Sequence, residues 1–99
     1  MTILLKGAVD VISDGSVVKL NRTGNTALTV GGTGDVLTGI VAGMIAQGAA
    51  PFAAARIGAF SMGLAGDLAF SEKDFGMLAT DVIEKVPIVL RRFSVSADI

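Results

Sequence analysis

The sequence predicts an α/β protein in which a short strand and a β-hairpin precede three helices. Three observations lead to this prediction. Short apolar segments alternate with turn residues near the N-terminus, a glycine-rich stretch is followed at once by helical periodicity, and alanine and glycine dominate the segment after Pro51. Apolar runs separated by Asp-Gly favour hairpins, and apolar residues at helical spacing favour helices. With 99 residues, the chain is long enough for one small domain.

The N-terminal segments are predicted to be strands joined by tight turns. Residues Ile3 to Leu5 are apolar and end at Lys6-Gly7, so we expect a buried strand followed by a turn. The segment from 13 to 16 has the sequence SDGS, and Asp-Gly is favoured in two-residue hairpin loops. Residues 8 to 20 are therefore predicted to form a β-hairpin, and the polar segment from 21 to 27 a loop.

The first two predicted helices follow the glycine-rich stretch. The first runs from Gly34-Asp35 to about Gln47, and Gly48 is a plausible C-terminal stop. Pro51 suits the first turn of a second helix near 51 to 70. Because that segment is rich in Ala and Gly, neighbouring elements can approach it closely, and we expect it to be buried.

A charged connection from 71 to 76 and a third helix complete the predicted fold. The third helix is expected to run from Thr80 or Asp81 to Arg92, with the Thr80 hydroxyl as N-cap. Its inward positions are predicted to be Val82, Ile83, Val86 and Leu90.

The composition excludes several classes of function. The net charge is −1, and without a basic block we expect no nucleic-acid partner. The chain contains neither Cys nor His. Thiolate metal sites and histidine bases are therefore excluded, so acid–base chemistry has to use Asp, Glu or Lys, and we assign no residue as a metal ligand. The N-terminus has no secretory signal, and we expect a cytoplasmic protein.

The apolar content raises the question of what covers this chain. Hydrophobic residues make up 52% of it, charged residues only 17%, and the mean hydropathy is +0.70. A membrane span is one explanation, since no charged residue lies between Val36 and Ala55. However, Gln47-Gly48 and Pro51 interrupt this run, so we expect two short helices and no membrane. The other explanation is burial against a further polypeptide.

The stretch from 29 to 43, TVGGTGDVLTGIVAG, is the strongest functional signal. Backbone N–H groups at a helix start are unpaired and partly positive, and glycines let an anion approach them. The spacing matches neither the Walker pattern nor the dinucleotide-binding fingerprint. From the residues alone, Asp35 has two interpretations. It either caps the helix, or it is a general base next to an anion site whose amides stabilise a transferred phosphoryl group.

Several segments together resemble one known family. The segment GGTGDVLTGIVAG resembles the Gly-Thr-Gly-Asp anion-hole motif of the ribokinase-like superfamily. Within it, the chain is similar to the C-terminal part of the ADP-dependent NAD(P)H-hydrate dehydratases, the carbohydrate-kinase-like domain. The segments LLKGAVDVISDG, NRTGNTALTVGGTGDVLTGIVAGMIAQG, GLAGDLAF and GMLATDVIEKVPIVLRRF carry this resemblance in order, over residues 3 to about 93.

The resemblance implies a function and a set of site residues. Such enzymes dehydrate hydrated NADH or NADPH, driven by hydrolysis of ADP or ATP, with Mg²⁺ bridging the phosphates. By this likeness Asp35 is the general base and contacts the substrate hydroxyl. The amides of Gly32, Thr33 and Gly34 form the anion hole. The implied nucleotide-binding residues are Lys6, Gly7, Ala8, Val9, Asp10 and Gly34. Asn25 is either part of the phosphate loop or an ordinary turn residue. For Asp67, the simpler interpretation is a residue on the polar face of a helix.

The chain departs from the family in length, because such domains are considerably longer. We therefore expect residues 1–99 to be the C-terminal nucleotide-binding half of a ribokinase-like domain without its N-terminal half. The partner that covers its apolar surface is then the missing half or a second copy of the chain. Two alternatives stay open: a fragment of a kinase for a sugar or vitamin hydroxyl, and a catalytically silent nucleotide-binding or assembly module.

Overall fold

The computed structural model describes the backbone of residues 1–97 and the side chains of residues 1–91. The helices and strands occur in the predicted order, so the α/β prediction of a short strand, a hairpin and three helices is confirmed. They are β1 (Ile3–Leu5), β2 (Asp10–Ser13), β3 (Val18–Asn21), the 3₁₀ helix η1 (Thr26–Thr29), α1 (Thr33–Ala46), α2 (Pro51–Lys73), the 3₁₀ helix η2 (Asp74–Gly76) and α3 (Ala79–Ala97).

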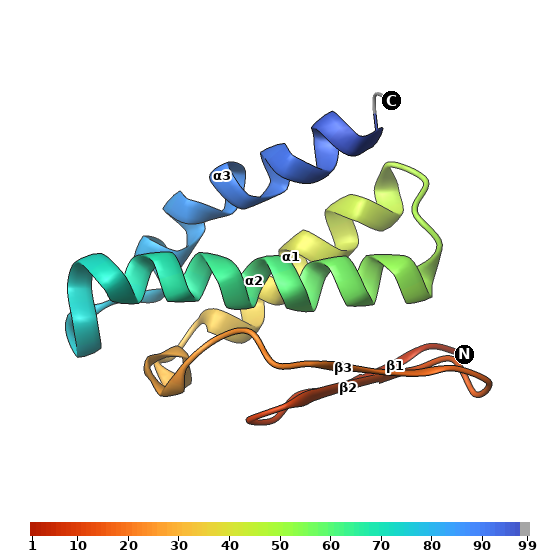
Figure 1. Ribbon diagram of the computed structural model, residues 1–99, viewed down its shortest axis with the longest axis horizontal. Helices are drawn as coiled ribbons and strands as arrows, with labels where there is room; N and C mark the ends of the chain where they lie inside the picture. Colours follow the sequence, from red (N-terminus) through yellow and green to blue (C-terminus); the bar gives the residue numbers. More distant parts are fainter. Residues whose placement is uncertain (98–99) are drawn as a thin grey trace.

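Helix α2 is the centre of the molecule. The three strands form an antiparallel sheet in the order β1-β2-β3, which lies along one side of α2 (Figure 1). Helix α3 lies on the opposite side of α2, and α1 packs against both helices. Because α2 contacts every other element, its small side chains decide how closely the layers approach.

The sheet buries only the face that points toward α2. Ile12 is 1% exposed and packs with Ala55 and Ala59 of α2. The prediction of a buried first strand is wrong, since Ile3 and Leu5 are 56% and 64% exposed. The physical reason is that successive residues of a strand point to opposite faces, and α2 covers one face only.

Tight turns join the strands and helices as predicted. Gly15 has φ +97° in the turn between β2 and β3, and the Asp14 carboxylate accepts hydrogen bonds from the amides of Ser16 and Val17. Gly48 has φ +100° after α1, and its amide donates to the carbonyl of Ile45. These are backbone conformations that glycine adopts without strain.

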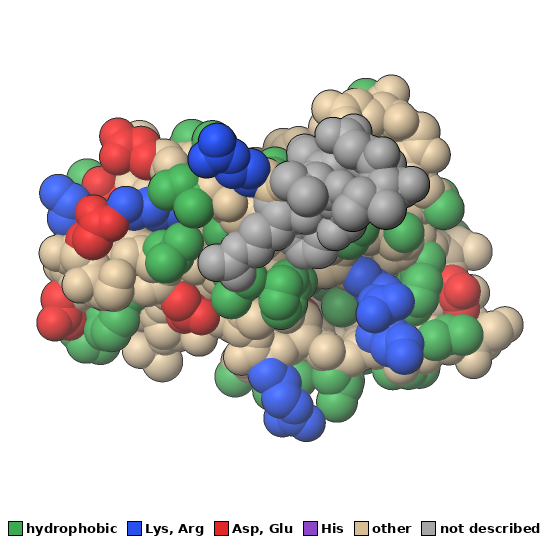
Figure 2. Space-filling view, turned by 45° about the horizontal axis from the view of Figure 1, so that its top comes forward, with side chains coloured by type: hydrophobic (Ala, Val, Ile, Leu, Met, Phe, Trp, Pro, Cys, Tyr) green, Lys and Arg blue, Asp and Glu red, His purple; other side chains and the backbone are tan. Residues whose placement is uncertain are grey.

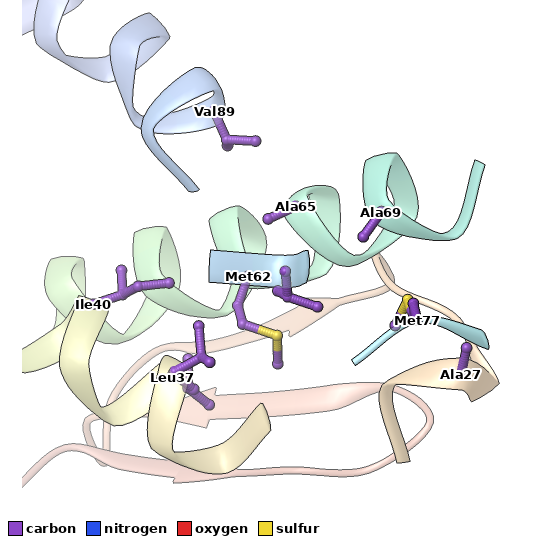
Figure 3. Packing of buried hydrophobic residues seen from close by; sticks show 10 residues of the cluster. Ala27, Leu37, Ile40, Met62, Ala65, Ala69, Met77 and Val89 are labelled. Carbon is purple, nitrogen blue, oxygen red and sulfur yellow. The ribbon is translucent and has the colours of Figure 1, made fainter. Parts of the chain in front are cut away.

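Two glycines of α2 allow the loop before α1 to lie directly on the helix. A Cβ added at Gly63 would lie 1.9 Å from Oγ1 of Thr23, and one added at Gly66 would lie 2.6 Å from Cδ2 of Leu28. The core combines alanine, methionine and branched aliphatic side chains, several of which Figure 3 shows. Its members are Ala27, Val36, Leu37, Ile40, Met62, Ala65, Ala69, Met77, Val82 and Val89.

The second half of the fold differs from the predictions at three places. The predicted connection from 71 is helical up to Lys73, because α2 is longer than expected. Helix α3 begins at Ala79, so Thr80 is inside the helix. The amide of Leu78 instead donates to the carboxylate of Asp81 at 2.7 Å. The predicted end at Arg92 is also too early, since α3 continues to Ala97.

One predicted inward residue of α3 is exposed. Val82 is fully buried, but Ile83 is 51% exposed, and Val89, which the pattern left out, is 1% exposed. Residues 82 and 89 are seven apart and share one helix face, whereas the side chain of residue 83 points about 100° away from that of 82. Among the described residues, the structure contains no helix long and apolar enough to cross a membrane.

Candidate functional site

The candidate site begins at the N-terminus of α1, where Gly32 is the N-cap residue. Gly32 has φ +95°, in the left-handed region. A Cβ at this position would also lie 3.0 Å from Cβ of Ala79, at the start of α3. Glycine is therefore required here for its backbone conformation and for space, and the packing of α3 against the loop fixes the direction in which α1 starts.

The side chain of Thr33 is buried and hydrogen-bonded within the protein. It is 6% exposed, and its hydroxyl donates to the carbonyl of Leu28 at 2.8 Å. The first hydrogen bond of α1 is made by Val36, whose amide donates to the carbonyl of Gly32 at 3.2 Å. The amides of Thr33, Gly34 and Asp35 thus precede the helical hydrogen bonds, which is the arrangement that binds anions at helix starts.

Gly34 and Asp35 face solvent at this helix start. Both are exposed, and a Cβ built at Gly34 would meet no atom within 4 Å. Within the described residues, the Asp35 carboxylate accepts no hydrogen bond and forms no salt bridge. An anion can therefore approach the amides without displacing a side chain, and the carboxylate beside them is free to accept a proton.

Asp35 lies at the wall of an open apolar groove between α1 and α3. The groove has a volume of about 1150 Å³, and its lining includes Gly39, Gly43, Val86 and Leu90. Figure 2 turns the side that carries α3 toward the reader and shows hydrophobic side chains reaching the surface across it. Groups of nucleotide size fit a groove of this volume.

The predicted nucleotide-binding residues from 6 to 10 lie at the turn between β1 and β2. In Figure 1 this turn and the start of α1 lie toward the same end of the molecule. Lys6, Gly7 and Ala8 are exposed and Val9 is half-buried. Asp10 is 7% exposed, and its carboxylate accepts hydrogen bonds from the amide of Gly7 at 3.1 Å and from Nδ2 of Asn21 at 2.9 Å. Its side chain therefore shapes the turn, and no described contact joins it to Asp35.

A row of polar contacts holds the segment between β3 and η1 on α2. Nδ2 of Asn21 also donates to the carbonyl of Ala59 at 3.1 Å. Asp67 of α2 accepts hydrogen bonds from the amide of Gly24 at 3.1 Å and from Nδ2 of Asn25 at 2.8 Å. Asn25 in turn accepts from the amide of Ala27 and caps η1. Asn25 and Asp67 thus position the loop that leads to the glycines.

Asn21 is a member of this arrangement that the sequence pattern did not indicate. A signal was nonetheless present, because the polar residue Asp10 lies near the start of the predicted hairpin and the polar residue Asn21 directly follows its end. They are direct partners in the strand register, and both are buried. The pair lies at the open end of the hairpin, away from its turn. Its buried polar atoms are satisfied by their mutual hydrogen bond, by the amide of Gly7 and by the carbonyl of Ala59.

The part of the chain that the structure describes has few ligands for a metal ion held by the protein. No group of three or more acidic side chains within the described residues could hold one. At the helix start, Asp35 is the carboxylate beside the amides. Mg²⁺ commonly binds through one or two carboxylates together with substrate phosphates. The donor set therefore fits an ion carried by nucleotide phosphates and does not fit an ion held by the protein alone.

These features define a class of protein. An α/β arrangement with a Gly-Thr-Gly-Asp helix start open to solvent is consistent with part of a ribokinase-like fold. A family model for the carbohydrate-kinase-type NAD(P)H-hydrate dehydratases matches residues 1–88. The chain belongs to this family.

Curated relatives of this chain bear names from the same family. A bifunctional NAD(P)H-hydrate repair enzyme of Pyrobaculum aerophilum is 54% identical over 92 residues, which are 93% of this chain and 18% of the relative. Its counterpart in Hyperthermus butylicus is 53% identical over 90 residues, 91% of this chain and 17% of the relative. An ADP-dependent (S)-NAD(P)H-hydrate dehydratase of Cenarchaeum symbiosum is 47% identical over 93 residues, which are 94% of this chain and 32% of the relative. The chain thus spans between a sixth and a third of these relatives.

Proposed function

We propose that this chain is the nucleotide-binding and base-bearing part of an NAD(P)H-hydrate dehydratase. The observation that carries the proposal is the open first turn of α1, where unobstructed Gly34 and the exposed Asp35 carboxylate lie side by side. The names of the relatives support hydrated NADH or NADPH as substrate. One relative is named as ADP-dependent, which favours ADP over ATP as the nucleotide.

In the proposed reaction, Asp35 accepts the proton of the hydrate hydroxyl. The hydroxyl oxygen then forms a bond to the terminal phosphorus of the nucleotide, and the bond from that phosphorus to the bridging oxygen breaks. The amides of Gly32, Thr33 and Gly34 stabilise the charge on the transferred group. Phosphate then leaves with the electron pair of the C–O bond, and a proton on the neighbouring carbon passes to water, so that its C–H electron pair forms the double bond of the cofactor.

The turn from Lys6 to Asp10 is proposed to contact the nucleotide. The Lys6 side chain is exposed and can pair with a phosphate, and Gly7 and Ala8 allow a ligand close to the backbone. Val9 and Asp10 would contribute backbone groups, because the Asp10 carboxylate is already hydrogen-bonded. Mg²⁺, if carried by the nucleotide, would neutralise phosphate charge at this place.

The proposal also concerns the rest of the domain. We propose that residues 1–99 are the C-terminal half of the dehydratase domain and that much of the substrate pocket comes from outside them. The small share of each relative that the chain covers supports this division. A cytoplasmic location belongs to the same proposal, since NADH and NADPH are water-soluble. No relative given above bears a kinase name, so the kinase alternative is not favoured.

Titration calorimetry of ADP into the chain with Mg²⁺ tests the nucleotide site. Gly34→Val is expected to weaken binding at least tenfold, because its side chain would fill the space in front of the amides. The matched control is Ala42→Val, which places the same side chain at an exposed position of the same helix, outside the groove lining and more than two turns away. Equal affinities of these two variants would contradict the assignment.

The role of Asp35 is tested by Asp35→Asn in the same experiments. ADP affinity is expected to change less than about threefold, while dehydration of NADH hydrate falls by roughly 10²–10⁴ if Asp35 is the general base. A variant that loses ADP binding and keeps its turnover would show that the carboxylate serves binding instead. Because affinity and turnover are measured separately, a chain that binds ADP without turnover still tests the site.

A further inference from the structure

Asp67 is a residue of α2 that uses both of its carboxylate oxygens outside that helix. Oδ2 accepts a hydrogen bond from the amide of Gly24 at 3.1 Å, and Oδ1 accepts one from Nδ2 of Asn25 at 2.8 Å. Both contacts are partly buried, so solvent screens them less than contacts at the surface. Because aspartate is among the less favourable residues for a helix interior, we attribute its place in α2 to these two bonds.

From Asn25, further hydrogen bonds lead to the start of α1. The Asn25 side chain accepts a hydrogen bond from the amide of Ala27 at 3.0 Å and so caps η1. Within η1, the carbonyl of Leu28 accepts a hydrogen bond from the Thr33 hydroxyl at 2.8 Å. The segment between residues 24 and 33 is thus held at both ends by side chains. Asp67 holds it on α2, and Thr33 holds it on α1.

Gly24 lies at the point where this segment meets α2. It has φ +105°, and a Cβ built on it would lie 3.0 Å from Cδ1 of Leu28 and 3.6 Å from Cα of Gly63. Glycine has the greatest backbone freedom of all residues, so the segment could most easily turn away from the helix here. The two hydrogen bonds of Asp67, one at Gly24 and one at Asn25, remove that freedom.

We infer that Asp67 is a positioning residue of the nucleotide site. Its carboxylate fixes the segment on α2, and the segment fixes Thr33, whose amide belongs to the proposed anion hole together with those of Gly32 and Gly34. The inference rests on the proposed function, because an anion hole stabilises a transferred phosphoryl group only when its amides are oriented in advance. In this role Asp67 acts through Asn25 and does not contact the nucleotide.

A double-mutant cycle between residues 25 and 67 tests this role. In Asp67→Asn, the side-chain N–H groups of Asn25 meet a second amide, and in Asn25→Asp two carboxylates face each other. Each single variant therefore loses the hydrogen bond between the two side chains. The double variant restores it in reverse, with the new amide at position 67 as donor and the new carboxylate at position 25 as acceptor. Each new side chain also keeps an oxygen for the amides of Gly24 and Ala27.

Titration of ADP with Mg²⁺, at a temperature at which circular dichroism shows every variant folded, gives the first result. Each single variant is expected to bind ADP about tenfold more weakly, the equivalent of one charge-assisted hydrogen bond, and the double variant to recover most of this loss. Removing the charge of Asp67 would by itself favour an anionic ligand, so a loss of affinity in Asp67→Asn has the opposite sign.

The matched control is Glu72→Gln, which removes the same charge from the same helix. It breaks the ion pair of Glu72 with Lys85, which holds α3 and not the segment before α1. Because this pair is partly exposed, ADP affinity is expected to change less than about threefold. Single variants that bind ADP as the control does, or a double variant weaker than both single variants, would overturn the inference.

The backbone amide signals of residues 32–34 in proton–nitrogen correlation spectra give a second result, which needs no ligand. These signals are expected to shift or broaden in Asp67→Asn, to return in the double variant, and to stay unchanged in Glu72→Gln. Asn25→Ser is a milder variant for the case that Asp67→Asn does not fold, because serine retains the cap of η1 and loses the donor to Asp67.

The two results separate this inference from the proposed function. A parent chain without affinity for ADP would contradict the proposed function, and the amide signals would still decide the role of Asp67. Unchanged signals of residues 32–34 in both Asp67→Asn and Asn25→Ser would show that the carboxylate does not position the anion hole.

Discussion

At the scale of single residues, Ser61 is a buried polar side chain that the fold leaves without a partner. It lies in α2, it is 0% exposed, and its hydroxyl forms no hydrogen bond within the described residues. We expect Ser61→Ala to raise the free energy of unfolding by about 1 kcal/mol, because an unsatisfied hydroxyl no longer has to be desolvated. Urea denaturation measures the change.

The matched control for this prediction is Ser71→Ala in the same helix. Ser71 is exposed, and its hydroxyl donates to the carbonyl of Leu68 at 2.7 Å. Its replacement is expected to change the free energy of unfolding by less than about 0.5 kcal/mol. Destabilisation by Ser61→Ala would show that the buried hydroxyl has a partner in solution, such as an ordered water.

Asp14 makes the stability of the hairpin depend on pH. Hydrogen bonds from the amides of Val17 and Ser16 hold the pKa of the Asp14 carboxyl below its usual 3.8. A lowered pKa in the folded state means that the ionised group adds stability above the unfolded pKa. That stability is lost as the pH falls through the folded value. Asp14→Asn should therefore lower the unfolding midpoint at about pH 6 and have progressively less effect toward about pH 2.5. An equal effect at both pH values would contradict this origin.

At the scale of the elements, the glycines of the helices divide into two kinds. Gly63 of α2 lies against Thr23, where an added Cβ would also come within 2.8 Å of a backbone carbon. Gly43 of α1 faces open space. We expect Gly63→Ala to destabilise the fold by roughly 2 kcal/mol or more through overpacking. Gly43→Ala should stabilise it by about 0.5–1 kcal/mol through helix propensity.

Thermal unfolding of both variants checks this contrast. Because each replaces glycine by alanine inside a helix, intrinsic propensity favours both equally, and the difference between them measures the close approach of the loop to α2. A stabilised Gly63→Ala variant would mean that the segment around Thr23 can move away from the helix without cost.

At the scale of the whole molecule, the proposed nucleotide site couples stability to ligand concentration. A ligand that binds only the folded chain stabilises it by mass action, so ADP at about 100 times its Kd is expected to raise the free energy of unfolding by about 2.7 kcal/mol. Gly34→Val should remove most of this effect. A melting temperature of the parent chain that does not change with added ADP would speak against the nucleotide site.

Local patterns in the sequence were sufficient for most of the fold. The Asp-Gly turn, the stop at Gly48 and Pro51 at the start of α2 each act through the backbone of a few neighbouring residues, so they could be recognised without tertiary structure. The helix start after the glycine stretch was equally local, whereas the roles of Gly34 and Asp35 in binding and catalysis stay predictions. The family resemblance, carried by the order of these segments, was confirmed by the match over residues 1–88.

What only the tertiary structure decided was which faces are covered. The sequence could not show that Ile3 and Leu5 are exposed, or that Val89 and not Ile83 faces the core. Nor could it show that the Asp10 side chain holds the turn between β1 and β2, and that Asn25 and Asp67 hold the loop before α1. Burial and polar pairing depend on contacts between residues distant in the chain, whereas turns and helix ends depend on neighbours. An apolar residue looks the same in the sequence whether α2 covers it or solvent does.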